Sequence, residues 1–118
     1  MDEKRFVVQE HTTPEGVHWD LMLENGDVLK TFRLSGPPEI ALERPLRAEP
    51  IFDHPTRFLM YEGPVQKGTG RVRIVDRGRY DERSRTETRW ELFFDGAVLK
   101  GDFSLAQIEH DEWQFAHE

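Results

Sequence analysis

Short runs in which apolar and polar residues alternate are the most regular pattern along the chain. The clearest covers residues 17–24, where Trp19, Leu21 and Leu23 recur at every second position. Successive side chains of a β-strand point to opposite faces, so these three residues predict a strand with one face on a hydrophobic core. The second face then carries four other side chains: His18, Asp20, Met22 and Glu24.

Comparable β-prone runs recur along the sequence. They lie at 6–9, 28–34, 58–62, 71–76, 90–94, 98–105 and 113–115. The turn sequences NGD at 25–27 and DG at 95–96 separate neighbouring runs and predict hairpins. Residues 39–43 lie between two prolines and favour a short helical turn, whereas no segment has a sustained period of 3.6 residues.

Many short strands with turn signals about every ten residues are typical of a β-sandwich or a β-barrel. The chain has 118 residues, which fits a single domain over residues 1–118. We therefore expect a mainly-β fold with little helix. The expected architecture is a small antiparallel barrel of about eight strands whose mouth holds a ligand.

Composition excludes several classes of protein. The chain has no cysteine, which excludes disulfides, a thiol nucleophile and a cysteine-based zinc finger. No apolar run approaches the roughly 20 residues that span a bilayer, and the N-terminal sequence has no apolar segment of signal-peptide length. With 33% charged residues, we expect a soluble cytoplasmic protein without a membrane partner.

Charge is distributed unevenly along the chain. The formal net charge of −7 disfavours generic nucleic-acid binding, because such binding rests on neutralising phosphates. Residues 67–89, however, contain eight basic and four acidic side chains, so this segment carries +4 and the rest of the chain −11. A local basic face can meet a phosphate backbone although the whole protein is acidic. The alternative is a solvated charged hairpin.

The five histidines fall into two groups. His110 and His117 lie in a polar, acidic C-terminal sequence and are expected at the surface. His54 precedes a proline, which holds it in an extended conformation and gives its ring a defined direction. His11 and His18 lie just before and within the alternating run at 17–24.

Asp20 together with two of the imidazoles of His11, His18 and His54 would form a site for a divalent metal. Two nitrogens and one carboxylate oxygen suit Mn²⁺, Fe²⁺ or Zn²⁺ and leave positions open for water and substrate. A metal in such a site binds a phosphate oxygen and lowers the pKa of bound water. The competing interpretation is that His18 and Asp20 are ordinary surface residues of a strand. Glu24 is expected to orient a histidine or to be structural.

Several longer segments together resemble one known family. FVVQEH at 6–11, HWDLMLE at 18–24 and VLKTF at 28–32 resemble the start of the 3′-phosphoesterase domain found at the N-terminus of bacterial DNA ligase D. The resemblance continues through FDHPTRFLMYEG at 52–63, VDRGRY at 75–80 and ELFFDGAVLKGDFSL at 91–105. The segments cover almost the whole chain in the order of the family.

The resemblance implies a small β-barrel with an active-site crater at one mouth. It also implies Mn²⁺-dependent trimming of DNA 3′ ends, in which a 3′-terminal ribonucleoside and then the 3′-phosphate are removed during DNA repair. The implied metal ligands are His11, Asp20 and His54, and His18 would contact the scissile phosphate. The ligand set alone allows Zn²⁺ equally well.

Two positions depart from the family pattern. Met22 stands where the family usually has an arginine directed at the phosphate, and Phe58 replaces a tyrosine. Losing one charged phosphate contact costs roughly 1.5–3 kcal/mol. Arg33 or Arg47 is expected to supply the missing charge, and Arg47, near a family arginine that precedes the DHP motif, is counted with His18 among the catalytic candidates.

These departures leave more than one function open. The first is a stand-alone, monomeric 3′-end-healing phosphoesterase, with any DNA ligase or polymerase acting in trans. The second is a catalytically weakened barrel that binds a metal and a phosphate or nucleic-acid end without turnover. A third, in which the barrel is an interaction domain with structural histidines, predicts no metal uptake.

Overall fold

Strands dominate the computed structural model, which describes residues 4–65 and 70–118. The strands of the described residues are β1 (Lys4–Thr13), β2 (Gly16–Asn25), β3 (Val28–Leu34), β4 (Leu46–Pro55), β5 (Gly63–Pro64), β6 (Arg71–Arg85), β7 (Arg89–Gly96), β8 (Lys100–Glu109) and β9 (Glu112–His117). Two short 3₁₀ helices accompany them, η1 (Pro38–Leu42) and η2 (Thr56–Leu59).

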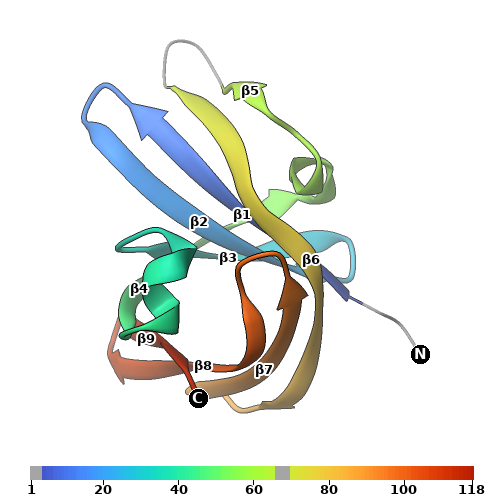
Figure 1. Ribbon diagram of the computed structural model, residues 1–118, viewed down its shortest axis with the longest axis vertical. Coiled ribbons are helices and arrows are strands. Elements are labelled where there is room, and N and C mark those ends of the chain that lie inside the picture. The colour runs from blue at the N-terminus through green and yellow to red at the C-terminus, as the bar shows by residue number, and fades with distance from the viewer. Residues whose placement is uncertain (1–3, 66–69) are drawn as a thin grey trace.

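The sheet closes on itself as a barrel (Figure 1). Neighbouring strands are hydrogen-bonded in the order β1-β2-β3-β4-β9-β8-β7-β6, and β1 pairs with β6 to complete the ring. The two-residue strand β5 pairs with the start of β6. The expected eight-stranded antiparallel barrel with little helix is thereby confirmed. Among the described residues, no helix has the length and apolar character needed to cross a membrane.

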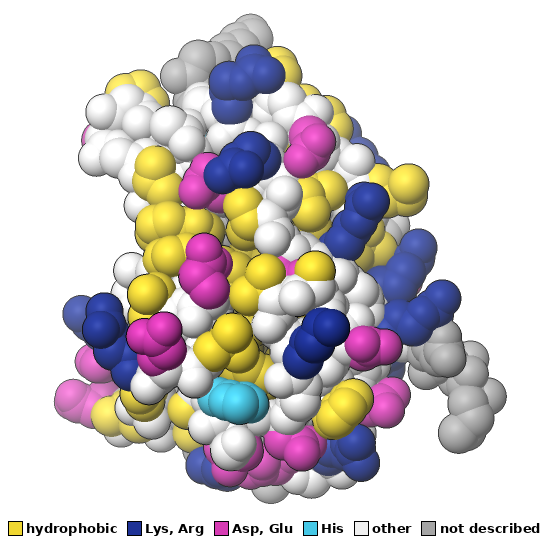
Figure 2. All heavy atoms as spheres, viewed as in Figure 1, with side chains coloured by type: hydrophobic (Ala, Val, Ile, Leu, Met, Phe, Trp, Pro, Cys, Tyr) yellow, Lys and Arg dark blue, Asp and Glu magenta, His cyan; other side chains and the backbone are white. Residues whose placement is uncertain are grey.

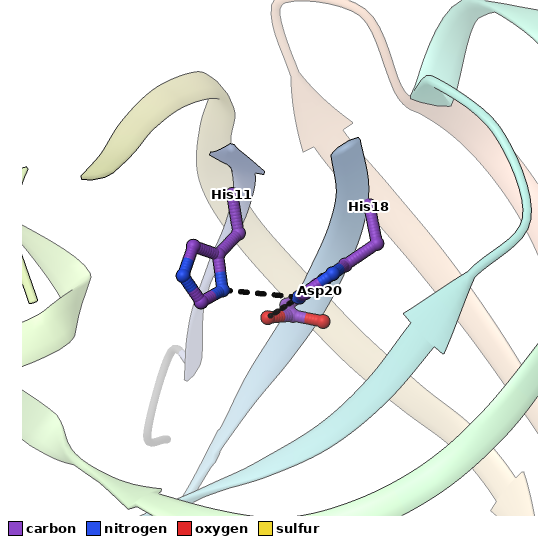
Figure 3. A group of neighbouring side chains, drawn as sticks. All are labelled: His11, His18 and Asp20. Carbon is purple, nitrogen blue, oxygen red and sulfur yellow. Dashed lines mark hydrogen bonds and ion pairs between the residues drawn. The ribbon is translucent and has the colours of Figure 1, made fainter. Parts of the chain in front are cut away.

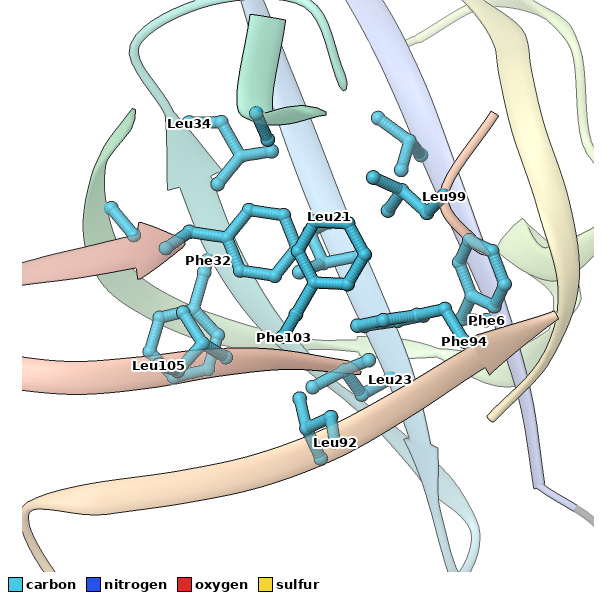
Figure 4. Close-up of a cluster of buried hydrophobic side chains, with 14 of the residues drawn as sticks. Phe6, Leu21, Leu23, Phe32, Leu34, Leu92, Phe94, Leu99, Phe103 and Leu105 are labelled. Atoms are coloured by element: carbon cyan, nitrogen blue, oxygen red, sulfur yellow. The ribbon is translucent and has the colours of Figure 1, made fainter. Parts of the chain in front are cut away.

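Apolar side chains from all eight barrel strands fill the interior (Figure 4). Phe94 makes edge-to-face contacts with Phe6, Phe103 and Phe115, at centroid distances of 4.8, 5.5 and 5.9 Å. Such arrangements place the positive edge of one ring against the negative face of another. Leu21 and Leu23 are fully buried here, which confirms the predicted core face of the 17–24 run.

Most predicted elements are present with wider bounds. Both predicted hairpins are present, and η1 lies where the short helical turn was expected. The turn at 25–27 joins β2 to β3, whereas β7 extends through Asp95 and Gly96, so the turn to β8 lies at 97–99 and the predicted strand start at 98 is wrong. The strand predicted at 58–62 is wrong, because this segment forms part of η2 and leads into β5. The apolar pattern does not predict β4, which Pro50 interrupts. Proline is tolerated there because β4 pairs with β9 only as far as Ala48, so the missing N–H belongs to an edge.

The second face of β2 is buried, which simple alternation does not predict. Asp20 and Met22 are only 3% and 1% exposed. Met22 belongs to a second, smaller apolar cluster with Val7, Leu29 and Leu59, the last of which comes from η2. The segment from η2 to β5 thus folds back over the outside of the barrel, and the interpretation of Asp20 as an ordinary surface residue is wrong.

The buried carboxylate of Asp76 organises the turn between β7 and β8. Its Oδ1 accepts hydrogen bonds from the backbone N–H groups of Ala97 and Val98 at 2.8 and 3.0 Å, and its Oδ2 accepts one from Leu99 at 2.8 Å. Gly96 is required beside it, because a Cβ there would lie 2.5 Å from Cζ of Phe6 and 2.9 Å from Oδ2 of Asp76. Asp76 therefore gives the VDRGRY segment a structural role.

We predict that Asp76→Ala lowers the free energy of unfolding by roughly 3 kcal/mol or more, because it leaves backbone N–H groups without their charged acceptor. Urea denaturation followed by tryptophan fluorescence measures the change. Asp81→Ala, at an exposed position of the same strand, is the matched control and should stay within about 0.5 kcal/mol of wild type. Equal free energies of unfolding for the two variants would contradict the structural role of Asp76.

Candidate functional site

The pairing register of three neighbouring strands brings the candidate side chains together. His11 of β1 lies opposite His18 of β2, and Asp20 of β2 lies between Gln9 of β1 and Arg33 of β3. These positions alternate with the core residues of the same strands, so the five side chains share the outer face of the sheet. The candidate residues expected at a mouth of the barrel therefore lie on this outer face of the sheet.

His11, His18 and Asp20 converge on one point (Figure 3). Nδ1 of His11 is 3.0 Å from Nε2 of His18, and the same Nε2 is 3.5 Å from Oδ2 of Asp20. Two ligand atoms that each lie about 2.1 Å from a metal ion are about 3.0 Å apart in an octahedron and about 3.4 Å apart in a tetrahedron. The distances from His18 to the other two side chains are of this size, and the potential ligand atoms of all three residues lie within 4.8 Å of one another.

The neighbours of His18 determine where its proton lies. A carboxylate accepts hydrogen bonds and cannot donate them, so the contact with Asp20 favours a proton on Nε2 of His18. With that tautomer, Nε2–H of His18 is also the donor toward Nδ1 of His11. His11 and Asp20 are then the acceptors, and a metal held by Nδ1 of His11 would take its single lone pair in place of this hydrogen bond.

His54 approaches the same region from β4. The hydroxyl of Thr31 donates its single hydrogen to the carbonyl of Leu29 at 3.0 Å, so it accepts from Nδ1–H of His54 at 2.9 Å. The Nε2 lone pair of His54 is then left for a ligand, the arrangement usual for metal-binding histidines. Within the described part of the chain, the close set of potential metal ligands is His11, His18 and Asp20. His54 lies outside that set.

A cavity of about 580 Å³ adjoins these groups. Its lining includes two of the candidate histidines and the aspartate, namely His11, His54 and Asp20. Side chains from the η2–β5 segment form another part of its wall. The side-chain amide of Gln9 donates hydrogen bonds to the carbonyls of Phe58 and Tyr61, at 3.0 Å each. Gln9 thereby fixes the segment that closes the cavity over the outer face.

Burial favours the neutral forms of two histidines of the site. Partial burial lowers the pKa of His18 from its ordinary value, although the attraction of Asp20 opposes the shift. Burial likewise lowers the pKa of His54. Neutral imidazole is the form that binds metal ions, so both rings are ready to act near neutral pH.

The two candidate arginines occupy different positions. Nε of Arg33 is 3.4 Å from Oδ1 of Asp20. Nε of Arg47 is 3.5 Å from Glu112, and the Arg47 side chain is 77% exposed. Both line an adjoining cavity of about 660 Å³ together with His18. Arg33 therefore touches the candidate metal ligands, whereas Arg47 lies farther along the surface.

The remaining sequence candidates lie outside the site. Glu24 is structural: it accepts a hydrogen bond from the backbone N–H of Arg5 at 2.9 Å and pairs with its guanidinium at 2.8 Å. The hydrogen bond from the Arg5 side chain lowers the pKa of Glu24. His110 and His117 are exposed, as expected. Lys67, counted in the basic segment, falls outside the described residues.

Sequence reasoning missed two side chains that position the site, Gln9 and Thr31. A signal for Gln9 was present, because it lies two residues before His11 and thus on the same strand face. Nothing in the sequence distinguishes Thr31 from an ordinary strand threonine, because its role depends on the approach of β4.

Comparisons with known proteins agree on one family. The family model of the DNA Ligase D 3′-phosphoesterase domain matches residues 9–107. The "Multifunctional non-homologous end joining protein LigD" of Mycolicibacterium smegmatis (strain ATCC 700084 / mc(2)155) is 37% identical over 124 residues, an alignment that covers 92% of this chain. The chain spans 16% of the length of that protein. Since the family model matches most of the chain, the chain belongs to the DNA ligase D 3′-phosphoesterase domain family.

Proposed function

We propose that this chain is a divalent-metal-dependent phosphoesterase that heals DNA 3′ ends by removing a 3′-terminal ribonucleoside and the 3′-phosphate. Membership of the family supports a phosphoesterase of DNA repair. The observation that carries the metal dependence is that His11 and Asp20 belong to one close group of potential ligands and that both line, together with His54, one cavity. The product would be a 3′-OH end that a DNA ligase or polymerase can use.

His11, Asp20 and His54 are the proposed metal ligands, with Mn²⁺ the expected ion and Zn²⁺ the alternative. When bound, such an ion would polarise a phosphate oxygen and stabilise the charge that develops on it. His18 is the proposed donor to a phosphate oxygen, because its Nε2–H points toward the other two groups. A fixed donor at the position where charge develops lowers the barrier of the reaction.

Arg33 is the proposed substitute for the arginine that the family usually has at position 22. Met22 is packed into the second apolar cluster and offers no charge. Arg33 stands in register with Asp20, and its side chain is 40% exposed, so it is accessible to a phosphate. Arg47 is the weaker candidate because its guanidinium is paired with Glu112, whereas that of Arg33 lies 3.4 Å from Asp20.

A basic surface on the far side of η2 provides a route for the DNA strand. Arg5, Arg77 and Arg79 line a cavity of about 460 Å³ with Met60, and none of its lining residues is acidic. Figure 2 shows dark blue basic side chains on the right of the view, where β6 runs in Figure 1. Such a local patch attracts a phosphate backbone although the net charge of the chain is −7.

A binding module without turnover is the second candidate function. Met22 and Phe58 favour it, because they replace a charge and a hydroxyl that the family usually directs at the substrate. Such a module would keep the proposed metal ligands and bind a phosphate or a nucleic-acid end.

We predict that the wild-type protein shortens a labelled primer-template that ends in one 3′ ribonucleotide and dephosphorylates one that ends in a 3′-phosphate, in Mn²⁺ but not in EDTA. His18→Ala and Asp20→Ala should each lower both rates by at least roughly 100-fold, because they remove a donor and a metal ligand. Gel electrophoresis of the products measures both reactions.

Two exposed residues on the far strands provide matched controls, Asp102→Ala and His117→Ala, and both variants should retain wild-type rates. Mn²⁺ uptake by wild type without any product would support the binding module. If the wild-type protein neither takes up Mn²⁺ nor forms product, the proposed function is overturned.

We also predict that Thr31→Val weakens Mn²⁺ binding about 10- to 100-fold, because Nδ1–H of His54 loses the acceptor that orients the ring. Isothermal titration calorimetry measures the affinity, and near-UV circular dichroism checks that the barrel remains packed. Thr88→Val, at an exposed position between β6 and β7, serves as the control. An unchanged affinity in a folded Thr31→Val variant would contradict the orienting role of Thr31.

A further inference from the structure

We propose that Phe52 is the platform on which the base of the 3′-terminal nucleoside stacks during removal. This inference rests on the proposed function and assigns a recognition role to a residue that neither the metal-ligand set nor the phosphate contacts include. The observation that carries it is a large, exposed aromatic face on the wall of the cavity that also holds the candidate metal ligands.

Phe52 is unusually exposed for its size and position. Its side chain lines the cavity together with His11, Asp20 and His54, yet the residue is 74% exposed. The pairing of β3 with β4 shifts register between Leu29 and Thr31, which indicates a bulge in β4 at this point. Bulges re-aim side chains and recur beside active sites, and here Phe52 and His54 both face the same cavity.

One face of the Phe52 ring is already used and the other is available. Its ring is stacked on the imidazole of His54, with centroids 4.8 Å apart and an interplanar angle of 19°. His54 in turn meets Phe58 edge-to-face at 5.6 Å, and the guanidinium of Arg57 lies 4.9 Å from the Phe58 centroid. The packing fixes the orientation of Phe52, so its solvent-exposed face is a preformed surface for a flat ring. Proteins hold single-stranded nucleic acid by stacking its bases on aromatic rings while basic side chains contact its backbone. Phe52 and Arg57 offer both kinds of group on the wall of this cavity.

The dimensions of the cavity favour the terminal nucleoside over those upstream. A volume of about 580 Å³ lies within the range of small-molecule sites, so the cavity accepts one nucleoside and not a duplex. A terminal nucleoside has a free end and can enter such a cavity, whereas an upstream nucleotide is continuous with the strand on both sides. With the scissile phosphate at His11, His18 and Asp20, the base that is removed would lie toward Phe52.

Stacking predicts a particular selectivity. Every base has a flat face, so stacking tolerates all four bases. Stacking on Phe52 instead favours a 3′ end that carries a base over a 3′-terminal sugar that has lost its base. It contributes nothing to the removal of a 3′-phosphate, because no terminal nucleoside remains in that substrate.

The test compares wild type with Phe52→Ala, Phe52→Trp and Ile108→Ala on three primer-templates. These end in a ribonucleotide, in the same ribose without its base, or in a 3′-phosphate. Phe52→Ala should raise KM for the ribonucleotide end by roughly 5- to 100-fold, and Phe52→Trp should restore it. On the abasic and 3′-phosphate ends, any change in KM should be much smaller than on the ribonucleotide end, because only the loss of base stacking is specific to the latter. Ile108, 55% exposed on β8, is the matched control for removing an exposed apolar side chain.

A binding measurement keeps the test independent of turnover. 2-Aminopurine at the 3′ terminus should lose fluorescence on binding to wild type and not on binding to Phe52→Ala, since stacking quenches it. Equal quenching by both proteins would overturn the inference, as would a KM change of equal size on all three substrates. Failure of wild type to hydrolyse any of the three would instead count against the proposed function, and the fluorescence result would still decide the role of Phe52.

Discussion

The pairing register of β1, β2 and β3 is the constraint on which the site depends. It sets His11 opposite His18 and places Asp20 beside Arg33. A slip of one residue in β2 would send these side chains into the barrel interior and bring Leu21 and Leu23 to the outside. The fully buried Leu21 and Leu23 make such a slip costly, so the hydrophobic core fixes the geometry of the polar face behind it.

The segment from η2 to β5 turns this polar face into a cavity. Gln9 holds the segment through two backbone carbonyls, and Leu59 fills the second apolar cluster against Val7 and Met22. Burial lowers the pKa of His54, which favours the neutral ring that a metal requires, and it also lowers the pKa of His18. The same packing explains why Met22 is compatible with the fold, because its side chain stabilises the cover of the cavity. Arg33 on the neighbouring strand is the proposed source of the charge that Met22 lacks.

The sequence predicted the elements that depend on local pattern. Alternation identified the core face of β2, and turn residues identified the two hairpins, because these features depend on neighbouring residues. The candidate cluster was also recognisable, since His11, His18 and Asp20 lie within ten residues of each other on paired strands. Features that depend on distant segments were not accessible. β4 is hidden by Pro50, which is tolerated because β4 has no pairing with β9 beyond Ala48. The burial of Asp20 depends on a segment more than thirty residues away. The orienting contact of Thr31 with His54 arises only where β3 and β4 meet.

The central claim is that two imidazoles and the carboxylate of Asp20 hold one divalent metal at this outer face. Electron paramagnetic resonance of the protein titrated with Mn²⁺ tests it most directly, with nitrogen couplings recorded by electron spin-echo modulation. We predict one tightly bound ion per chain, coupled to two imidazole nitrogens. One coupling should be lost in His11→Ala and one in His54→Ala, and both should persist in His18→Ala. A spectrum of free Mn²⁺ at all protein concentrations, or bound Mn²⁺ without nitrogen coupling, would contradict the account.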